Sequence, residues 1–196
     1  MAVIYHVEHG DTEYDAQDKA QGLIDSGLND AGRRQARAAA QLLKGRGIEC
    51  IYSSPMLRAR QTAEIVAKII GAKVIVRKHL QPLDIGTLTG KKNTTVKPYL
   101  EFFSSRPTLA FPKGETFGEW YDGARKEWIH QFADDDPVIA VVSHTRDWQL
   151  LKHWQRNGLD AGPEGIEFEE PGSGQVAKAS KHGNAISVRQ VTGEIG

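Results

Sequence analysis

The sequence has little cysteine, no long apolar run and no excess of either charge. Its single cysteine, Cys50, has no disulfide partner within the 196 residues, so we expect a buried thiol in a reducing, cytoplasmic setting. No stretch approaches the ~20 apolar residues that span a bilayer, and we expect no membrane partner. The 25 basic residues balance the 25 acidic ones, which argues against a nucleic-acid partner held by bulk electrostatics.

The length of the chain fits one domain. A chain of 196 residues can bury one sizeable core but is too short for two comfortable ones, and we expect a single domain over residues 1–196. Residues 1–7 have neither the basic start nor the long apolar core of a signal peptide. We therefore interpret them as the beginning of a strand.

Patterns typical of strands and helices alternate along the chain. Short β-branched or apolar runs predict strands at residues 2–7, 50–52, 73–76 and 138–142, and a terminal hairpin at 176–179 and 185–191. Apolar spacing and end signals predict helices at residues 31–44, 53–70, 96–104, 115–132 (with its exit at 134–137) and 145–157. This alternation predicts an α/β fold, a three-layer αβα sandwich with a mainly parallel central sheet.

Two histidines follow predicted strands. His9 stands at the end of the first strand, and His144 follows the apolar run at residues 138–142 after one serine. Ligands bind at the carboxyl ends of the strands in such sheets. Either histidine alone is more often a polar strand end. The two together, with Gly10 breaking the strand after His9, favour a site.

Paired imidazoles in such a place suit phosphoryl transfer. A neutral imidazole can attack phosphorus and form a covalent phosphohistidine, which divides one displacement into two easier steps. The transferring group spreads negative charge over its oxygens, so cations and N–H donors around it are the main catalytic resource. The site would need a nucleophilic histidine, one or two arginines, a second donor and an acid for the leaving oxygen.

Five segments resemble the motifs of one family, in the family's order. Residues 8–12 (E-H-G-D-T) are similar to a strand end that reads R-H-G-x-T, and residues 53–63 (S-S-P-M-L-R-A-R-Q-T-A) to S-S-x-x-x-R-A-x-Q-T-A. Residues 28–36 resemble L-x-x-x-G-x-x-Q-A, residues 112–116 resemble P-x-G-E-S, and residues 141–144 resemble V-S-H. This family is the histidine phosphatase superfamily, which includes cofactor-dependent phosphoglycerate mutases and many small phosphatases. The resemblance covers most of residues 3–150.

The resemblance implies a phosphoglycerate mutase-like fold and a role for each matching residue. His9 would be the phosphate-accepting nucleophile, and Arg58 would bind phosphate. His144 would stabilise the transferring group, and the loop of Gly10 and Thr12 would lie beside the phosphate. The implied function is a phosphatase-type hydrolase of small phosphate esters that works through a phosphohistidine on His9, without a cofactor.

Four positions depart from the family pattern, and one of them is Thr145, where glycine is common after the second histidine. Glu8 stands where the family has its first arginine, Pro82 where it has a glutamate near the acid position, and Asp15 where it often has asparagine. An ionised carboxylate ~4 Å from one phosphate charge costs about 4 kcal/mol at an effective dielectric constant near ~20. If the pocket is to bind phosphate, Glu8 must be protonated or turned away, or another cation such as Arg146 must compensate.

These departures leave the acid and the activity open. The proton donor would be Asp84, Glu115 or Glu8 itself, because a carboxyl group beside phosphate has a raised pKa. The chain is then an active phosphomonoesterase in which Arg58 and Arg146 hold phosphate, a degenerate relative that binds a ligand without catalysis, or an engineered inactive variant of an active phosphatase. We expect hydrolysis rather than mutase activity, because a bisphosphorylated intermediate needs a more basic cavity.

A metal site is the remaining alternative. Plausible metal ligands are Glu8, His9, Asp11, Asp15 and His144. The resemblance accounts for both histidines without a metal, so we expect none. The loop at residues 86–114 should cover the pocket, and it contains no motif that identifies the substrate beyond a small phosphate ester.

Overall fold

The structure is a computed structural model that describes residues 2–133, 138–167 and 172–192. Within these residues one sheet has the strand order β3-β2-β4-β1-β5-β6. The strands are β1 (Val3–Glu8), β2 (Cys50–Ser53), β3 (Lys73–Val76), β4 (Val138–Ser143), β5 (Val176–His182) and β6 (Ala185–Gln190). The first four run parallel, and β5 and β6 form an antiparallel hairpin at one edge. The predicted mainly parallel sheet and terminal hairpin are confirmed.

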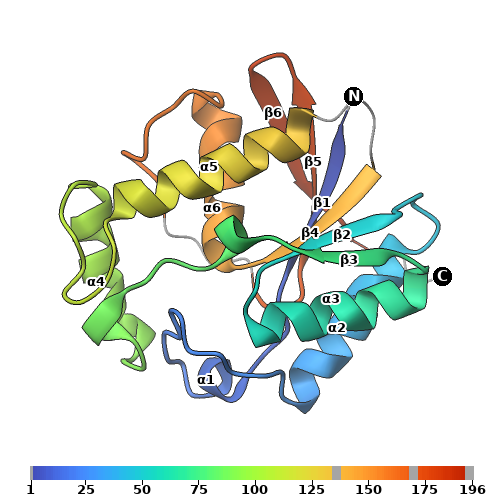
Figure 1. Cartoon of the computed structure of the whole chain (residues 1–196), viewed down its shortest axis with the longest axis horizontal. Coiled ribbons are helices and arrows are strands. Elements are labelled where there is room, and N and C mark those ends of the chain that lie inside the picture. Colours follow the sequence, from blue (N-terminus) through green and yellow to red (C-terminus); the bar gives the residue numbers. More distant parts are fainter. Residues whose placement is uncertain (1, 134–137, 168–171, 193–196) are drawn as a thin grey trace.

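Helices cover both faces of this sheet (Figure 1). They are α1 (Glu13–Ala16), α2 (Asp30–Leu43), α3 (Leu57–Ile70), α4 (Asn93–Ser104), α5 (Phe117–Ala133) and α6 (Thr145–Asn157), with 3-10 turns η1 (Lys78–Leu80) and η2 (Gly86–Leu88). The pair α2 and α3 lies on one face, and α5 and α6 lie on the other. The predicted three-layer sandwich is therefore confirmed. None of the described helices is long and apolar enough to cross a bilayer.

Strand β4 shows why both faces need a cover. Ile139 and Val141 belong to the apolar cluster that includes α5 and α6, whereas Ala140 and Val142 belong to the cluster that includes α2 and α3. Successive side chains of a strand point to opposite faces, so a continuous apolar run needs a helix layer on each side. The run at residues 138–142 is buried as the sequence predicts.

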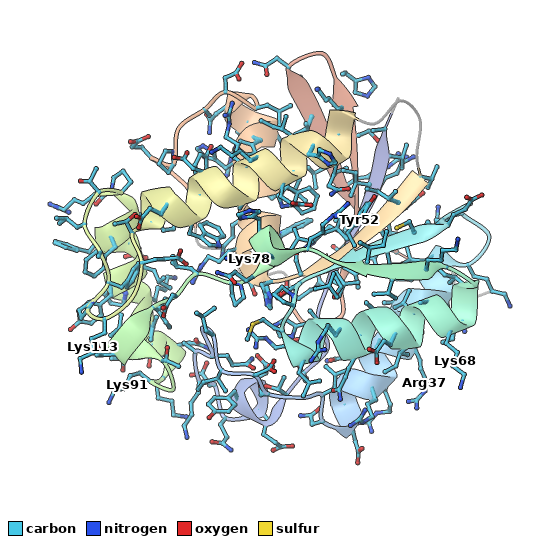
Figure 2. The ribbon with its side chains drawn as sticks, viewed as in Figure 1. Arg37, Tyr52, Lys68, Lys78, Lys91 and Lys113 are labelled. Atoms are coloured by element: carbon cyan, nitrogen blue, oxygen red, sulfur yellow. The ribbon has the colours of Figure 1, made fainter. Side chains whose placement is uncertain are left out.

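The helix ends follow local signals. The side chain of Asn29 accepts a hydrogen bond from the backbone N–H of Gly32 and so caps the start of α2. Helix α3 ends at Gly71, whose φ of 81° lies in the left-handed region that glycine adopts without strain. The polar faces point to solvent, and Figure 2 shows Arg37 and Lys68 extending outward from α2 and α3.

The irregular regions differ most from the sequence predictions. Helix α4 begins at Asn93 rather than near residue 96, and α3 begins at Leu57 rather than at residue 53. The turn-rich segment 11–29 contains α1, which is only four residues long. A single turn is held by its cap and has no apolar periodicity to detect. The predicted exit at residues 134–137 lies outside the described residues.

Candidate active site

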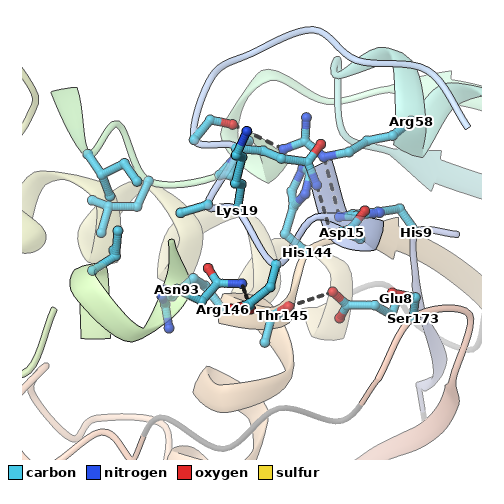
Figure 3. A pocket seen from close by; sticks show the side chains of 18 of the residues that line it. Glu8, His9, Asp15, Lys19, Arg58, Asn93, His144, Thr145, Arg146 and Ser173 are labelled. Carbon is cyan, nitrogen blue, oxygen red and sulfur yellow. Dashed lines mark hydrogen bonds between the residues drawn. The ribbon is translucent and has the colours of Figure 1, made fainter. Parts of the chain in front are cut away.

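A cavity of about 310 Å³ opens at the carboxyl ends of β1 and β4 (Figure 3). Both histidines predicted from the sequence line it. The residues on the side of the sheet and its adjoining helices include Glu8, His9, Arg58, His144, Thr145 and Arg146. The opposite side includes Pro82, Leu83, Ile85, Val96 and Leu100. The remaining polar lining includes Asp11, Asp15, Asp18, Lys19 and Asn93.

A hydrogen bond to the next residue holds the ring of His9 in one orientation. Its Nδ1 lies 2.9 Å from the carbonyl oxygen of Gly10. A carbonyl only accepts, so Nδ1 carries the proton and Nε2 keeps its lone pair. Burial first, and then the charge of Arg58, lower the pKa of His9 to about 4. The ring is therefore neutral near neutral pH, with a free nitrogen facing the cavity side.

The loop that carries His9 is fixed by two neighbouring helices. The backbone N–H of Gly10 donates to Thr62 Oγ1 on α3 at 3.1 Å. A Cβ on Gly10 would lie 2.4 Å from the carbonyl oxygen of Gly32, and a Cβ on Gly32 would lie 2.2 Å from that of Asp11. The side chain of Gln35 on α2 binds both the backbone N–H and the carboxylate of Asp11. Only glycine allows so close a packing of loop and helix.

Arg58 reaches His9 from the first turn of α3. Its Nε donates to His9 Nε2 at 3.3 Å, so the cation faces the nitrogen that is free to react. The two terminal nitrogens donate to the carbonyl oxygens of Ile24 and Gly22 at 2.8 and 3.0 Å. Burial lowers the pKa of Arg58 to about 10, which leaves the guanidinium charged at neutral pH.

His144 offers a hydrogen-bond donor to the same space. Its ring lies 5.2 Å from the His9 ring, centroid to centroid. Its Nε2 is 2.8 Å from Ser54 Oγ, and that hydroxyl accepts from the backbone N–H of Met56. We therefore assign the Ser54 proton to the bond with Nε2, which places the ring proton on Nδ1. This Nδ1 is buried and has no partner among the described residues, as a group that awaits a ligand would.

Glu8 is buried beside the nucleophile. Its side chain lines the cavity, and only 3% of the residue is exposed. One carboxyl oxygen, Oε1, accepts from Thr145 Oγ1 at 2.6 Å, and the other, Oε2, has no partner among the described residues. Burial raises the pKa of Glu8 to about 8. Of the alternatives stated from the sequence, a protonated Glu8 is the one that this environment favours.

Of the other residues predicted for the site, Arg146 is among the described residues that line the cavity and Thr12 is not. Arg146 lines the cavity, and its guanidinium donates to Gln149 Oε1 at 2.7 Å. Thr12 is fully buried and does not appear among the described lining residues. Its hydroxyl oxygen accepts from the backbone N–H groups of Tyr14 and Asp15 and so caps α1, and its one hydrogen lies within reach of Asp15 Oδ2 and Gln21 Oε1.

The two carboxyl groups predicted as acids both accept hydrogen bonds from backbone N–H groups. The N–H of Asp84 donates to Glu115 Oε1 at 2.8 Å, and the N–H of Gly86 donates to Asp84 Oδ1. Burial raises the pKa of Glu115. Neither carboxyl residue appears among the described residues that line the cavity, whereas Pro82 and Ile85 do.

Several supporting residues are not distinguished by the sequence pattern alone. Ser54, which holds His144, and Thr62, which holds Gly10, both fall inside the motif at residues 53–63. Gln35 falls inside the motif at residues 28–36. The motifs contained the signal, but a spacing pattern does not say which backbone group each polar side chain binds. Among the described residues, no group of three or more His, Cys, Asp or Glu side chains could hold a metal ion.

Comparison with known proteins assigns this arrangement to a family. The model of the histidine phosphatase superfamily (branch 1) matches residues 4–186. The chain belongs to the histidine phosphatase superfamily. The probable phosphoglycerate mutase GpmB of Photorhabdus laumondii is 35% identical over 124 residues, which cover 61% of this chain and 58% of that protein. Phosphoglycerate mutase-like protein 4 of Arabidopsis thaliana is 37% identical over 129 residues, 62% of this chain and 56% of that protein. The chain thus spans less than two thirds of the length of these relatives.

Solved structures with the same fold match over nearly the whole chain. A phosphoserine phosphatase from Entamoeba histolytica, in complex with 3-phosphoglyceric acid, has a TM-score of 0.78 and 21% identity over 99% of this chain and 98% of that one. A mycobacterial glucosyl-3-phosphoglycerate phosphatase in complex with VO3 has a TM-score of 0.77 and 22% identity over 99% of both chains. At these identities the likeness establishes the histidine phosphatase fold alone.

Proposed function

We propose that this histidine phosphatase-like protein hydrolyses small phosphate esters through a phosphohistidine on His9. The observation that carries the proposal is the position of His9 Nε2, which is unprotonated, buried and 3.3 Å from the Nε of Arg58. The unpartnered Nδ1 of His144 supplies a second donor in the same cavity. A lone pair, a cation and an N–H donor are the groups that an incoming phosphoryl group needs.

The reaction proceeds in two displacements. In the first, His9 Nε2 attacks phosphorus, an N–P bond forms, the ester P–O bond breaks, and the leaving oxygen takes up a proton. In the second, water attacks phosphorus, the N–P bond breaks, and phosphate leaves with His9 neutral again. Arg58 and His144 stabilise the charge that builds on the phosphoryl oxygens in both steps. Arg146 is the second cation that the cavity offers.

The proton for the leaving oxygen comes from one of three carboxyl groups. Asp84 and Glu115 remain candidates, although an inward turn of their side chains would be needed for either to reach the cavity. Glu8 already lines the cavity and holds its proton at neutral pH, since its pKa is raised to about 8. A carboxyl group that is protonated near the working pH can act as a general acid.

The charge of the cavity favours hydrolysis over transfer to a second substrate. The basic residues lining it are Lys19, Arg58 and Arg146, and the acidic ones are Glu8, Asp11, Asp15 and Asp18. A mutase must retain a bisphosphorylated intermediate, whose many negative charges require a surplus of cations. This mixed lining suits one phosphate group, so we propose a phosphomonoesterase that acts on small-molecule substrates.

A second candidate function is phosphate binding without turnover. It is favoured by Pro82, which lines the cavity at the place where the resemblance puts the acidic glutamate. Glu8 would add to the defect, because it stands where the resemblance puts a phosphate-binding arginine that forms paired hydrogen bonds. In this case the protein is a degenerate binding domain, or a variant engineered to be inactive.

The leaving group distinguishes the two candidates. p-Nitrophenolate leaves without protonation, whereas an alkoxide needs an acid. We expect p-nitrophenyl phosphate to be hydrolysed, and a quench in alkaline denaturant, which preserves the acid-labile N–P bond, to trap phosphate on His9. His9→Ala should remove both signals, and the exposed His130→Ala should keep both. Hydrolysis of an alkyl phosphate as well would establish a complete phosphatase. Vanadate binding without turnover of either ester would instead establish the binding domain.

A further inference from the structure

The carboxyl group of Glu8 is the least explained group in the cavity. It ends β1, immediately before the nucleophile, and it is almost fully buried. One oxygen is bound and the other is not, although buried polar atoms are nearly always paired. Figure 3 shows the bond to Thr145 at the base of the site, with His9 and His144 nearby. An unpartnered buried atom in a ligand cavity indicates a partner that arrives with the ligand.

The bond to Thr145 decides which oxygen carries the proton. Thr145 Oγ1 donates to Glu8 Oε1 at 2.6 Å, so Oε1 serves as the carbonyl-like acceptor. With the bond in this direction, we assign the hydrogen of the neutral carboxyl group to Oε2. Oε2 is the oxygen that has no partner among the described residues. The group therefore presents one O–H donor and no free negative charge.

The surroundings of Glu8 oppose its ionisation. The charged or titratable groups that face it from the neighbouring elements are Asp147 of α6, Asp15 of α1, Arg58 of α3, His6 of β1, His144 and Arg146. Burial raises the pKa of Glu8 most, the hydrogen bond from the Thr145 side chain lowers it, and the charges of Asp147 and Asp15 raise it further. His6 and His144 are neutral because burial lowers their pKa values. The hydrogen bonds from Thr145 and the charge of Arg58 favour the ionised form.

We propose that Glu8 binds the phosphoryl group as a neutral carboxylic acid, by donating a hydrogen bond from Oε2 to a phosphate oxygen. This inference rests on the proposed function, since it assumes that phosphate occupies the cavity between His9, Arg58 and His144. A neutral O–H group removes the repulsion that a carboxylate would exert on phosphate. It replaces that repulsion with a short O–H···O⁻ hydrogen bond in a site that excludes water.

Phosphate binding is then coupled to the proton on Glu8. Above the pKa of Glu8, the free protein must take up one proton for each phosphate that it binds. The affinity for phosphate therefore falls up to tenfold for each unit of rising pH in that range, because the fraction of protein with protonated Glu8 becomes smaller. Glutamine at this position keeps the shape, an acceptor for Thr145 and an N–H donor in place of O–H. The amide does not ionise, so Glu8→Gln should remove the contribution of this position to the pH dependence of phosphate binding.

The test compares the affinity for inorganic phosphate of the full chain and of Glu8→Gln between about pH 6 and about pH 9.5. Phosphate titrates equally for both proteins, so the ratio of their dissociation constants isolates Glu8. We expect the two constants to agree within about threefold at the acidic end, and the wild type to be weaker by at least tenfold at the alkaline end. Calorimetry in two buffers of different ionisation enthalpy should show proton uptake by the wild type that Glu8→Gln lacks.

Two further variants serve as controls for the role of Glu8. Glu13→Gln changes an exposed glutamate and should reproduce the wild-type pH profile. Glu8→Ala removes the donor, and it should bind phosphate about tenfold more weakly than Glu8→Gln at every pH. A flat ratio across the pH range, or tighter binding by Glu8→Ala than by Glu8→Gln, overturns the role of Glu8 alone. Failure of wild type and variants to bind phosphate at any pH overturns the proposed function as well.

Discussion

The two sides of the cavity are built in different ways. On the side of the sheet, hydrogen bonds fix both imidazoles and the guanidinium of Arg58, and two glycines clamp the loop that carries His9. On the opposite side, Pro82, Leu83 and Ile85 precede the 3-10 turn η2, and α4 supplies Val96 and Leu100. No carboxyl group from the described part of residues 82–115 lines the cavity.

This difference separates two tasks of a phosphatase. Under the proposed function, the side of the sheet would bind and attack the phosphoryl group, and the opposite side would face the leaving group. The first task depends on a few polar atoms held within tenths of an ångström, whereas the second needs a correctly placed acid. The sheet side of the cavity has its polar groups fixed by hydrogen bonds, whereas the opposite side is apolar. We therefore expect the protein to bind phosphate well but to hydrolyse unactivated esters slowly.

Removing Arg58 should have the largest effect on the phosphate-binding half. Arg58→Ala deletes the charged donor 3.3 Å from His9 Nε2, and we expect turnover of p-nitrophenyl phosphate to fall about a thousandfold. Arg58→Lys should recover only part of this loss, because an ammonium group cannot reproduce the fork that also binds the carbonyl oxygens of Ile24 and Gly22. The measurement is kcat/KM for each variant. Equal activity of Arg58→Ala and wild type would show that the phosphate-binding half does not depend on this cation.

Restoring a carboxyl group should have the next largest effect, on the leaving-group half. Pro82 lines the cavity, and Pro82→Glu would place an acid on the apolar side. We expect hydrolysis of an alkyl phosphate to rise about a hundredfold, with little change for p-nitrophenyl phosphate, whose leaving group needs no proton. Asp84→Asn and Glu115→Gln are the matched tests of the existing carboxyl groups. If either of these lowers alkyl phosphate hydrolysis strongly, the acid is already present and the contrast between the two halves is wrong.

Packing at the nucleophile loop should be sensitive to one added methyl group. In Gly32→Ala the new Cβ would lie 2.2 Å from the backbone oxygen of Asp11, so loop and helix must separate. We expect a loss of about 3 kcal/mol in the free energy of unfolding, from denaturant titration, together with lower activity. Gly123→Ala is the control, because this second helical glycine meets only the side chain of His79, at 3.3 Å. That variant should gain up to about 1 kcal/mol from helix propensity.

The smallest effect concerns stability and its dependence on pH. The pKa of Glu8 is raised from 4.5 to about 8 by burial. Between these values the folded protein holds a proton that the unfolded chain has released, so this contribution is complete below the lower value and is lost as pH rises through the upper one. Glu8→Gln should therefore match the wild type near about pH 5 and exceed its stability by roughly 3 kcal/mol near about pH 8. Buried His6 and His9 act in the opposite direction in both proteins, so they cancel in the difference. Equal stability at both pH values would show that Glu8 is ionised in the folded protein.

The two sides also differ in how far the sequence predicts them. The strands before His9 and His144 are apolar runs with clear ends, so the sheet and the two imidazoles follow from periodicity and position. Arg58 follows from its motif. These predictions concern regular elements, in which neighbours in the chain determine where a side chain points.

The irregular side could not be predicted in the same way. Its course depends on contacts between distant backbone groups, such as the approach of Gly86 to the carbonyl oxygen of Pro112. The sequence offered Asp84 and Glu115 as acids, but the hydrogen bond between them fixes Glu115 against the backbone. The burial of Glu8 and its hydrogen bond to Thr145 could not be predicted either, because both depend on residues that are distant in the sequence.

Helix α3 links the cation and the nucleophile mechanically. Arg58 leaves its first turn, and Thr62, one turn later, receives the N–H of Gly10 in the loop of His9. A shift or tilt of α3 would therefore move the guanidinium of Arg58 and pull on the loop of His9 at the same time. His9 is also tied to the sheet, because its backbone N–H donates to the carbonyl oxygen of Ser143 on β4, so the spacing of the pair reports how α3 sits against that end of the sheet.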